Sequence, residues 1–303
     1  MKFGLIGIPF NGDGTRPDVE NPAASLRRAG ISTLPIGRED TLLDYGDLDI
    51  TAFEGLRDRE TGVLNLEAWK ETSLQAAKQL CSISKEVDFT FVLGGDCSVL
   101  LGIFGAFSLS RMRVGLVSLD GHTDYRDPFS SPSGEPADLE LAILTGNGPE
   151  ALTELFGKAP LIEPSDVVVC GFREPDLIAM SKIHYFNRSA FREYGSEKFA
   201  HKTLLLLGDL DRLWFHFDVD ALDPAIMPVS FPEPDGLAID ETQAFISAVI
   251  GSKKFIGMSI SCYHPRLDPE GRAASSIVEL SGSVLPSCRK PLNSSDTLTR
   301  AAE

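Results

Sequence analysis

The sequence predicts one doubly wound α/β domain, and three observations support this prediction. Apolar runs rich in β-branched and aromatic residues recur along the chain, and each ends near a Gly or an Asp. Their apolar character is continuous rather than alternating, which is typical of parallel strands buried on both faces. Stretches compatible with helices lie between the runs, and this alternation is the pattern of a doubly wound sheet.

The expected strands are the apolar runs themselves, and the expected helices are the stretches between them. Strands are expected at residues 2–8, 88–96, 114–122, 166–174, 213–220 and 255–261. Helices are expected at residues 65–84, 98–107, 137–144, 174–183, 241–250 and 269–285. Residues 288–303 lack apolar periodicity and are expected to form a flexible tail, so we predict a single domain over residues 1–287.

Composition limits the classes of function. The chain has 303 residues, of which 43% are hydrophobic, enough for a substantial core. Its net charge of −16 argues against nucleic-acid or membrane-surface partners, and no apolar run is long enough to span a membrane. The first residues are interpreted as a strand rather than a signal peptide. The cysteines are odd in number and widely spread, which favours a reducing, cytoplasmic location: Cys81, Cys97, Cys170, Cys262 and Cys288.

Two predicted strand ends carry acidic side chains at alternate positions. "SLDGHTDYRD" contains Asp120, His122 and Asp124, and "FHFDVDALDP" contains Asp218 and Asp220. Alternate residues of an extended segment project to one side, and the carboxyl ends of parallel strands form the functional edge of a sheet. Carboxylates gathered there would repel one another, and divalent cations would neutralise them. One such pair would be interpreted as structural, but two clusters favour a site for Mn²⁺, Fe²⁺ or Zn²⁺.

The motifs "GGDCS", "DGHTD" and "DVDALDP" resemble, in this order, three signature motifs of the ureohydrolase superfamily of arginases, agmatinases and formiminoglutamases. The resemblance runs from about Gly4 to Leu280 and includes the opening "GIPFNGDGTRPDVENPAASLRRAG". It implies a three-layer α/β sandwich around a mainly parallel eight-stranded sheet. It also implies two Mn²⁺ ions per chain at the strand ends, a small-molecule substrate and a homo-oligomer, commonly a trimer or hexamer.

The resemblance assigns roles to the five acidic and histidine residues of the two clusters. Asp120 and Asp218 would bridge the two metals, Asp124 would bind the first metal, and His122 and Asp220 would bind the second. A hydroxide bridging the metals would attack the amidine carbon, and the tetrahedral intermediate would release an amine. Asp124, by accepting a hydrogen bond from that hydroxide, would relay a proton to the leaving nitrogen.

Cys97, in "VLGGDCSVLLG", stands where the family has a histidine that binds the first metal. A thiolate ligand there would bias the site toward Zn²⁺ or Fe²⁺ relative to Mn²⁺. Two alternatives remain open. Cys97 would be a neutral packing residue beside a weak or absent metal, or a covalent nucleophile with His122 as the only nearby base.

The substrate side departs from the family pattern. Cys262 stands where arginases and agmatinases have a guanidinium-binding Glu, and Ser133 stands where arginases have a His; a buried core role is the alternative for Cys262. Glu135, close to Ser133, is a candidate for acid–base catalysis. Arg126 suits an acidic group on the substrate, and His264 is either a substrate contact or a loop cap.

We therefore expect a metal-dependent hydrolase of non-peptide C–N bonds in linear amidines. The substrate would be a guanidino or formimino compound, in an agmatinase-like or formiminoglutamase-like enzyme, and Cys262 and Ser133 argue against plain arginase activity. The alternative is a metal-poor, inactive family member that binds a ligand or acts as a structural subunit. His184, His201 and His216 have no ligand spacing and are interpreted as structural.

Overall fold

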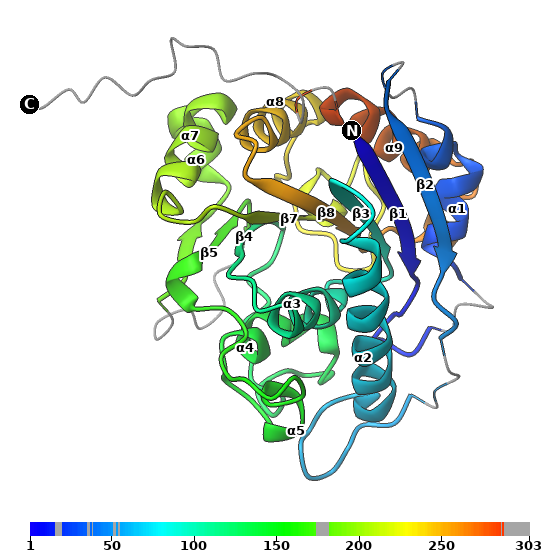
Figure 1. The fold of residues 1–303 in the computed structure, drawn as a ribbon, viewed down its shortest axis with the longest axis vertical. Coiled ribbons are helices and arrows are strands. Elements are labelled where there is room, and N and C mark those ends of the chain that lie inside the picture. Colours follow the sequence, from blue (N-terminus) through cyan, green and yellow to red (C-terminus); the bar gives the residue numbers. More distant parts are fainter. Residues whose placement is uncertain are drawn as a thin grey trace, which may run out of the picture.

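The computed structural model describes residues 1–15, 20–34, 37, 39–50, 53, 55–173, 182–285 and 287. Over these residues the chain forms one eight-stranded sheet between two layers of helices (Figure 1). All paired strands are parallel, in the order β2-β1-β3-β8-β7-β4-β5-β6. The three-layer α/β fold expected from the sequence is confirmed.

The bounds of the elements are as follows. The strands are β1 Lys2–Ile8, β2 Thr41–Asp47, β3 Phe89–Gly94, β4 Gly115–Leu119, β5 Val167–Cys170, β6 His184–Phe186, β7 Leu213–Asp218 and β8 Phe255–Ser261. The α-helices are α1 Pro22–Arg28, α2 Leu66–Ile83, α3 Val99–Leu109, α4 Glu140–Leu144, α5 Glu150–Thr153, α6 Ser189–Tyr194, α7 Ser196–Leu206, α8 Ile239–Ile250 and α9 Arg272–Val284.

The six predicted strands correspond to β1, β3, β4, β5, β7 and β8, whereas the two edge strands were not predicted. Every residue of β2 is exposed or half-buried, and β6 has only three residues, all half-buried. Edge strands lack a neighbour on one side, so they do not need a continuous apolar run. A search for such runs therefore finds the interior of the sheet and misses its edges.

Four predicted helices, at residues 65–84, 98–107, 241–250 and 269–285, are confirmed as α2, α3, α8 and α9. The helix expected at 137–144 is shorter, because a 3₁₀ turn at Pro136–Asp138 precedes α4. The helix expected at 174–183 falls mainly on residues 174–181, which lie outside the described residues, as does the predicted tail at 288–303. Helices α5, α6 and α7 were not predicted. In the described part of the chain, no helix has the length and apolar character needed to cross a bilayer.

Both faces of the sheet are buried. Phe91 and Phe215 pack in the core beneath α1, α6, α7, α8 and α9. Val92 and Leu116 point to the opposite face and pack in the core beneath α2, α3, α4 and α5. Because the faces are mostly apolar, the buried carboxylates gather at the carboxyl ends of the strands.

Local sequence explains two helices next to these strand ends. Asn21 accepts a hydrogen bond from the Ala24 N–H (2.8 Å) through its side chain, and Pro22 begins α1 with a pre-set φ angle. Helix α3 is apolar on almost every side, which is typical of a helix buried on all sides. It packs against α2 (Figure 1) and α4. Its first turn follows the loop that carries Cys97.

Candidate metal centre

Three strands, β3, β7 and β4, carry the predicted metal ligands at or just after their carboxyl ends, and β8, which lies between β3 and β7, carries Cys262 there. Asp218 is the last residue of β7 and pairs with Ser261, the last residue of β8. Cys97 follows β3, and Asp120 follows β4 directly. Residues up to 165 positions apart in the sequence therefore meet at one edge of the sheet.

The turn after β3 positions Cys97. A Cβ atom on Gly95 would lie 2.1 Å from the Phe10 carbonyl oxygen, so only glycine allows this close approach of two backbones. The next residue, Asp96, is buried and accepts a hydrogen bond from the Ser98 N–H (3.0 Å). The sequence "GGDCS" thus makes a rigid turn that directs Cys97 toward β7 and β8.

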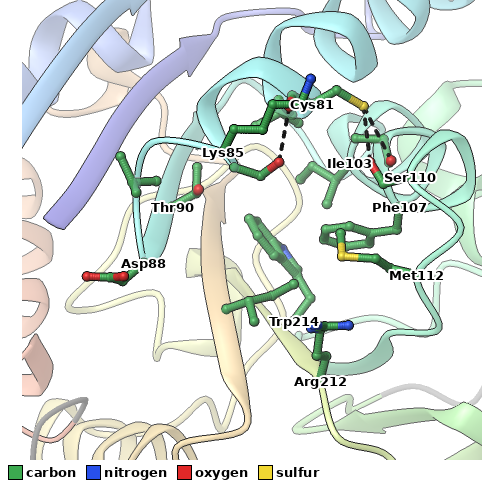
Figure 2. Close-up of a pocket in the computed structure, with 15 residues that line it drawn as sticks. Cys81, Lys85, Asp88, Thr90, Ile103, Phe107, Ser110, Met112, Arg212 and Trp214 are labelled. Carbon is green, nitrogen blue, oxygen red and sulfur yellow. Dashed lines mark hydrogen bonds between the residues drawn. The ribbon is translucent and has the colours of Figure 1, made fainter. Parts of the chain in front are cut away.

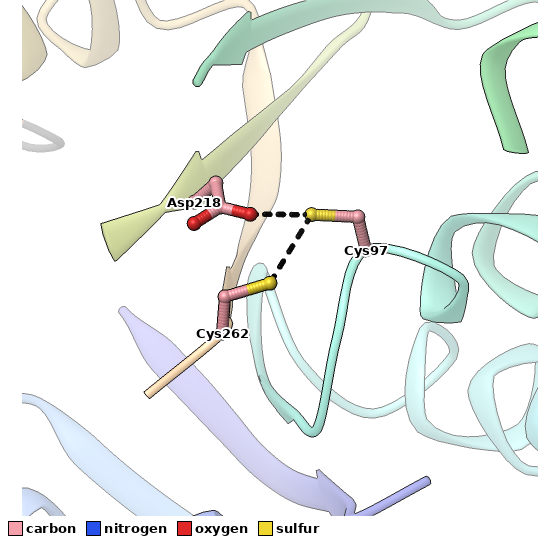
Figure 3. A group of neighbouring side chains, drawn as sticks. All are labelled: Cys97, Asp218 and Cys262. Carbon is pink, nitrogen blue, oxygen red and sulfur yellow. Dashed lines mark hydrogen bonds between the residues drawn. The ribbon is translucent and has the colours of Figure 1, made fainter. Parts of the chain in front are cut away.

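The thiol of Cys97 is fully buried among polar atoms rather than in the apolar core. Its Sγ donates to Asp218 Oδ2 at 2.7 Å and lies 3.2 Å from Ser261 Oγ. Cys262 Sγ, at the end of β8, is 3.7 Å from Cys97 Sγ (Figure 3). Cys97, Asp218 and Cys262 form a group of candidate ligand atoms that all lie within 4.8 Å of one another.

Asp120, His122 and Asp220 form a second group of the same kind. His122 Nδ1 lies 2.8 Å from Asp220 Oδ2, and the other oxygen of Asp220 accepts from the Gly121 N–H at 2.8 Å. Asp120 accepts from the backbone N–H of His122 at 2.7 Å. These backbone hydrogen bonds fix both carboxylates and leave one oxygen of each directed toward the ligand cluster.

Two carboxylates connect the groups. Asp120 also belongs to a third group, with Cys97 and His216, and so lies between the thiol and His122. Asp218 contacts Cys97 through Oδ2, while its Oδ1 accepts from the Asp220 N–H at 2.8 Å. Both side chains are therefore placed to face two sites at once.

Burial and mutual repulsion control the charges of this centre. Burial and the charge of Asp220 raise the pKa of Asp120 to about 7, and burial raises the pKa of Asp218 well above its ordinary value. Burial disfavours a charge on His122, but its hydrogen bond and ion pair with Asp220 outweigh burial and raise the His122 pKa to about 10. Positive charge is needed to ionise these carboxyl groups fully, and the donor set of carboxylate, imidazole and thiol therefore fits divalent cations.

Asp124 and Glu140 lie behind Asp120. Asp124 is buried with φ +43°, and its pKa is raised well above the ordinary value by burial and by the charges of Asp120 and Glu140. Glu140, at the start of α4, is also buried and hydrogen-bonds Asp124, while its Oε2 has no hydrogen-bond partner among the described residues. Glu140 was not predicted as a site residue. The signal was an acidic residue within the apolar run "LELAIL".

His216, interpreted from the sequence as structural, lies directly beside Cys97. Its Nε2 is 3.2 Å from Cys97 Sγ, and its Nδ1 is 2.7 Å from Ser259 Oγ. Burial lowers its pKa to about 3, so the ring is neutral. Two positions before Asp218 on β7, His216 satisfies the same alternation rule that found the acidic ligands, and that rule would have placed it on the same side of the strand.

The proposed substrate-side residues occupy the loop after β4 and the turn after β8. The Ser133 hydroxyl contacts Asp138 Oδ2 at 3.4 Å and accepts from the Glu135 N–H at 3.1 Å. Burial and the charge of Asp138 raise the pKa of Glu135 to about 7. Arg126, half-buried, donates its backbone N–H to the Asp138 carbonyl at 2.9 Å. These contacts bring Arg126, Ser133 and Glu135 around one aspartate.

Both ring nitrogens of His264 have partners within the loops. Nε2 lies 3.2 Å from Ser230 Oγ, and Nδ1 lies 3.5 Å from Glu20 Oε1. This geometry provides the loop-capping contacts that were one of the two interpretations of His264, and it leaves the substrate-contact interpretation untested.

A pocket of 340 Å³ lies away from this centre, at the opposite edge of the sheet (Figure 2). It is lined by the C-terminal ends of α2 and α3 and by the first residues of β3, β7 and β8, including Thr90 and Trp214. Cys81 lies there, with Sγ 3.4 Å from Ser110 Oγ. None of the predicted site residues lines this pocket.

The fold and the cluster of polar donors at its carboxyl edge define an α/β enzyme with candidate metal sites. The chain belongs to the arginase family, whose family model matches residues 1–285. It is a ureohydrolase-type enzyme, and the resemblance found in its motifs is confirmed.

Arginases from other organisms match this chain in sequence and in structure over most of its length. Arginase of Bacillus caldovelox is 27% identical over 288 residues, which cover 92% of this chain and 96% of the relative. Its solved structure superposes with a TM-score of 0.84, covering 96% of this chain and 99% of that chain. Human arginase-1 is 28% identical over 277 residues, covering 88% and 85% of the two chains. Formimidoylglutamase of Bacillus subtilis is 19% identical with a TM-score of 0.74, covering 94% of this chain and 86% of that chain, and this likeness shows a shared fold alone.

Proposed function

We propose that the chain hydrolyses a non-peptide C–N bond of a linear amidine, either a guanidino or a formimino compound, with two divalent cations bound at the carboxyl edge of the sheet. The observation that carries this proposal is the convergence of two candidate ligand groups from four adjacent strand ends. Membership of the arginase family supports the reaction class.

The ligands would divide between two sites. Asp120 and Asp218 would be shared, because each faces both groups. His122 and Asp220 complete a hard oxygen–nitrogen set that suits Mn²⁺. Cys97 completes the other set, which is softer and suits Zn²⁺ or Fe²⁺ better. The family resemblance adds Asp124 to this site, although Asp124 belongs to none of the three groups of close ligand atoms.

The cations, when bound, would supply the positive charge that activates a water molecule and polarises the amidine. Asp124 would hold and return the proton, since its carboxyl group adjoins Asp120 and exchanges a hydrogen bond with Glu140. Glu135, with a pKa raised to about 7, can gain and lose a proton near neutral pH, as a second acid–base group must.

The substrate would be held by Arg126, Ser133 and His264 at the loops around the centre. Arg126 suits a carboxylate on the substrate. A carboxylate at position 262 is missing, so a guanidinium group would lack the ion pair that the family resemblance implies. This favours a substrate other than arginine.

The test is a panel of guanidino and formimino compounds incubated with the purified enzyme and Mn²⁺, Zn²⁺ or Fe²⁺. Release of urea, formamide and ammonia would be measured for each pair. We expect cation-dependent turnover of at least one compound, and arginine to be a poor substrate. Metal analysis of the same samples would report two cations per chain.

The control is Asp127→Asn, because Asp127 is an exposed loop residue that caps the Phe129 N–H (3.0 Å) away from the ligand groups. It should match the wild type. Absence of both bound cations and turnover would contradict the proposal and favour the ligand-binding or structural alternative.

Light scattering would test the expected homo-oligomer, and fractionation would test the expected cytoplasmic location.

A further inference from the structure

We propose that Cys262 is a second thiolate ligand, so that Cys97, Cys262 and Asp218 together form a site for a thiophilic cation, with Zn²⁺ as the expected ion. The inference rests on the proposed function only for the place of the site in the fold. It assigns to the metal a residue that the sequence placed on the substrate side.

The two sulfurs already have the separation that zinc requires. Cys97 Sγ and Cys262 Sγ lie 3.7 Å apart (Figure 3). Two thiolates bonded to one tetrahedral Zn²⁺ at about 2.3 Å lie about 3.8 Å from each other, whereas a disulfide would need about 2 Å. Asp218 Oδ2, 2.7 Å from Cys97 Sγ, is the third ligand. When Zn²⁺ replaces the thiol proton, the distance from this oxygen to Cys97 Sγ would increase by about 0.8 Å.

The backbone holds Cys262 in an unusual conformation that presents its sulfur to Cys97. Its φ is +63°, in the left-handed region that non-glycine residues rarely adopt. The Cys262 N–H donates to the Gly95 carbonyl at 2.7 Å, which ties the end of β8 to the turn that carries Cys97. The next residue, Tyr263, is buried and donates to Asp268 Oδ2 at 2.9 Å. The hydrogen bonds of Cys262 and Tyr263 hold this strained backbone in place, and such maintained strain is characteristic of functional positions.

A chain of hydrogen bonds places a donor beside the first sulfur. The Trp214 indole N–H donates to Ser259 Oγ at 3.0 Å, and Ser259 Oγ lies 2.7 Å from His216 Nδ1. When the Ser259 hydroxyl donates to Nδ1, the neutral ring carries its hydrogen on Nε2, 3.2 Å from Cys97 Sγ. A fixed N–H donor supports a metal-bound thiolate in the way that outer hydrogen bonds support other metal ligands.

Asp120, which the proposed function shares between the two sites, would complete a tetrahedral set for this ion with Cys97, Cys262 and Asp218. Because Asp120 and Asp218 also face the other site, this cation would lie beside the second cation and serve the proposed reaction. It also accounts for the cysteine at position 262. That side chain would bind the cation and would not be used to pair with a guanidinium group.

The experiment uses Co²⁺ as a spectroscopic probe for Zn²⁺ in the reduced full-length protein. Each cobalt–thiolate bond contributes to a charge-transfer absorption band in the near ultraviolet. We expect Cys97→Ser and Cys262→Ser each to lose about half of the wild-type band, and added Zn²⁺ to abolish the band in the wild type. Cys81→Ser is the matched control and should leave the band unchanged, because Cys81 lies at the distant pocket.

A full band and unchanged Zn²⁺ affinity in a folded Cys262→Ser protein would overturn the proposal. If that variant does not fold, alkylation of the wild type gives the answer. Zn²⁺ should protect Cys262 from iodoacetamide, as measured by mass spectrometry, and should not protect Cys81. Equal labelling of Cys262 with and without Zn²⁺ would overturn the assignment.

This failure differs from failure of the proposed function. A missing second thiolate bond would leave Mn²⁺-dependent amidine hydrolysis intact. Lack of hydrolysis with every cation would leave the cobalt–thiolate band intact.

Discussion

The two halves of the centre share one edge of the sheet but differ in chemistry. One half gathers sulfur atoms from Cys97 and Cys262 around Asp218, and the other gathers the carboxylates of Asp120 and Asp220 around His122. Soft thiolates prefer Zn²⁺, while oxygen and imidazole donors also suit Mn²⁺. The comparison indicates that neighbouring ligand groups at one edge of a sheet can prefer different cations. Each strand end contributes its own side chain, so the donor atoms change from one group to the next.

The largest effect is expected from Asp120→Asn, since Asp120 belongs to groups on both sides of the centre. Loss of a shared ligand weakens both cations, and a cation's charge stabilisation is worth several kcal/mol, so kcat/KM should fall by roughly 10³-fold. Metal analysis should show that both Zn²⁺ and Mn²⁺ are lost. Loss of one cation only would mean that Asp120 belongs to a single site.

Cations should stabilise the two halves independently. A ligand present at 100 times its Kd stabilises the folded state by about 2.7 kcal/mol, so Zn²⁺ and Mn²⁺ should each raise the Tm by several degrees over chelated protein. In Cys262→Ser, the Zn²⁺ shift should decrease while the Mn²⁺ shift persists, as measured by calorimetry. An equal decrease in both shifts would contradict separate preferences.

His216→Leu removes the donor beside Cys97 Sγ without changing Cys97, Cys262 or Asp218, the ligands assigned to the zinc site. Loss of such an outer hydrogen bond typically costs 10–100-fold in metal affinity, so Zn²⁺ binding should weaken by about that factor while Mn²⁺ binding changes little. His216→Gln should restore part of the affinity because its side-chain amide can donate. Competition titrations with a chelator would measure both constants. Equal weakening of Mn²⁺ binding would indicate a general packing defect.

The smallest effect concerns pH in the chelated protein. The pKa of His122 is raised from 6.5 to about 10 by Asp220, despite burial, so folded His122 keeps a proton that the unfolded chain loses above its ordinary pKa. The contribution of this proton to the free energy of unfolding is fully present below pH 6.5 and is lost as the pH rises toward 10. Between about pH 7 and 8.5, below the ordinary thiol pKa, the free energy of unfolding should fall by up to about 1.4 kcal/mol per pH unit.

Denaturant unfolding at several pH values would measure this slope. His122→Gln should flatten it, because glutamine does not titrate. Saturating Mn²⁺ should also flatten it, since the cation replaces the proton between His122 and Asp220. An unchanged slope in His122→Gln would show that other groups control stability in this range.

The interior of the sheet and most of the acidic cluster could be predicted from sequence alone. Continuous apolar runs identified six central strands because burial on both faces demands them. Alternation predicted Asp218 and Asp220 on one side of an extended segment, but β7 ends at Asp218, and Asp220 lies in a 3₁₀ turn and reaches the centre in a different ligand group. The edge strands β2 and β6 escaped because partly exposed strands need no such pattern. Glu140 and His216 were missed because each lies within an apolar run, although alternation with Asp218 would have found His216.

The sequence by itself determined the fold class, the order of the motifs and the family, since these depend on periodicity and on residues close together in the chain. Only the tertiary structure decided that Cys262 lies against Cys97, 165 positions away, and that His216 lies behind that thiol. The physical reason is the strand order. β3, β8 and β7 are neighbours in the sheet although far apart in the chain, so which side chains meet at their ends depends on topology rather than on sequence spacing.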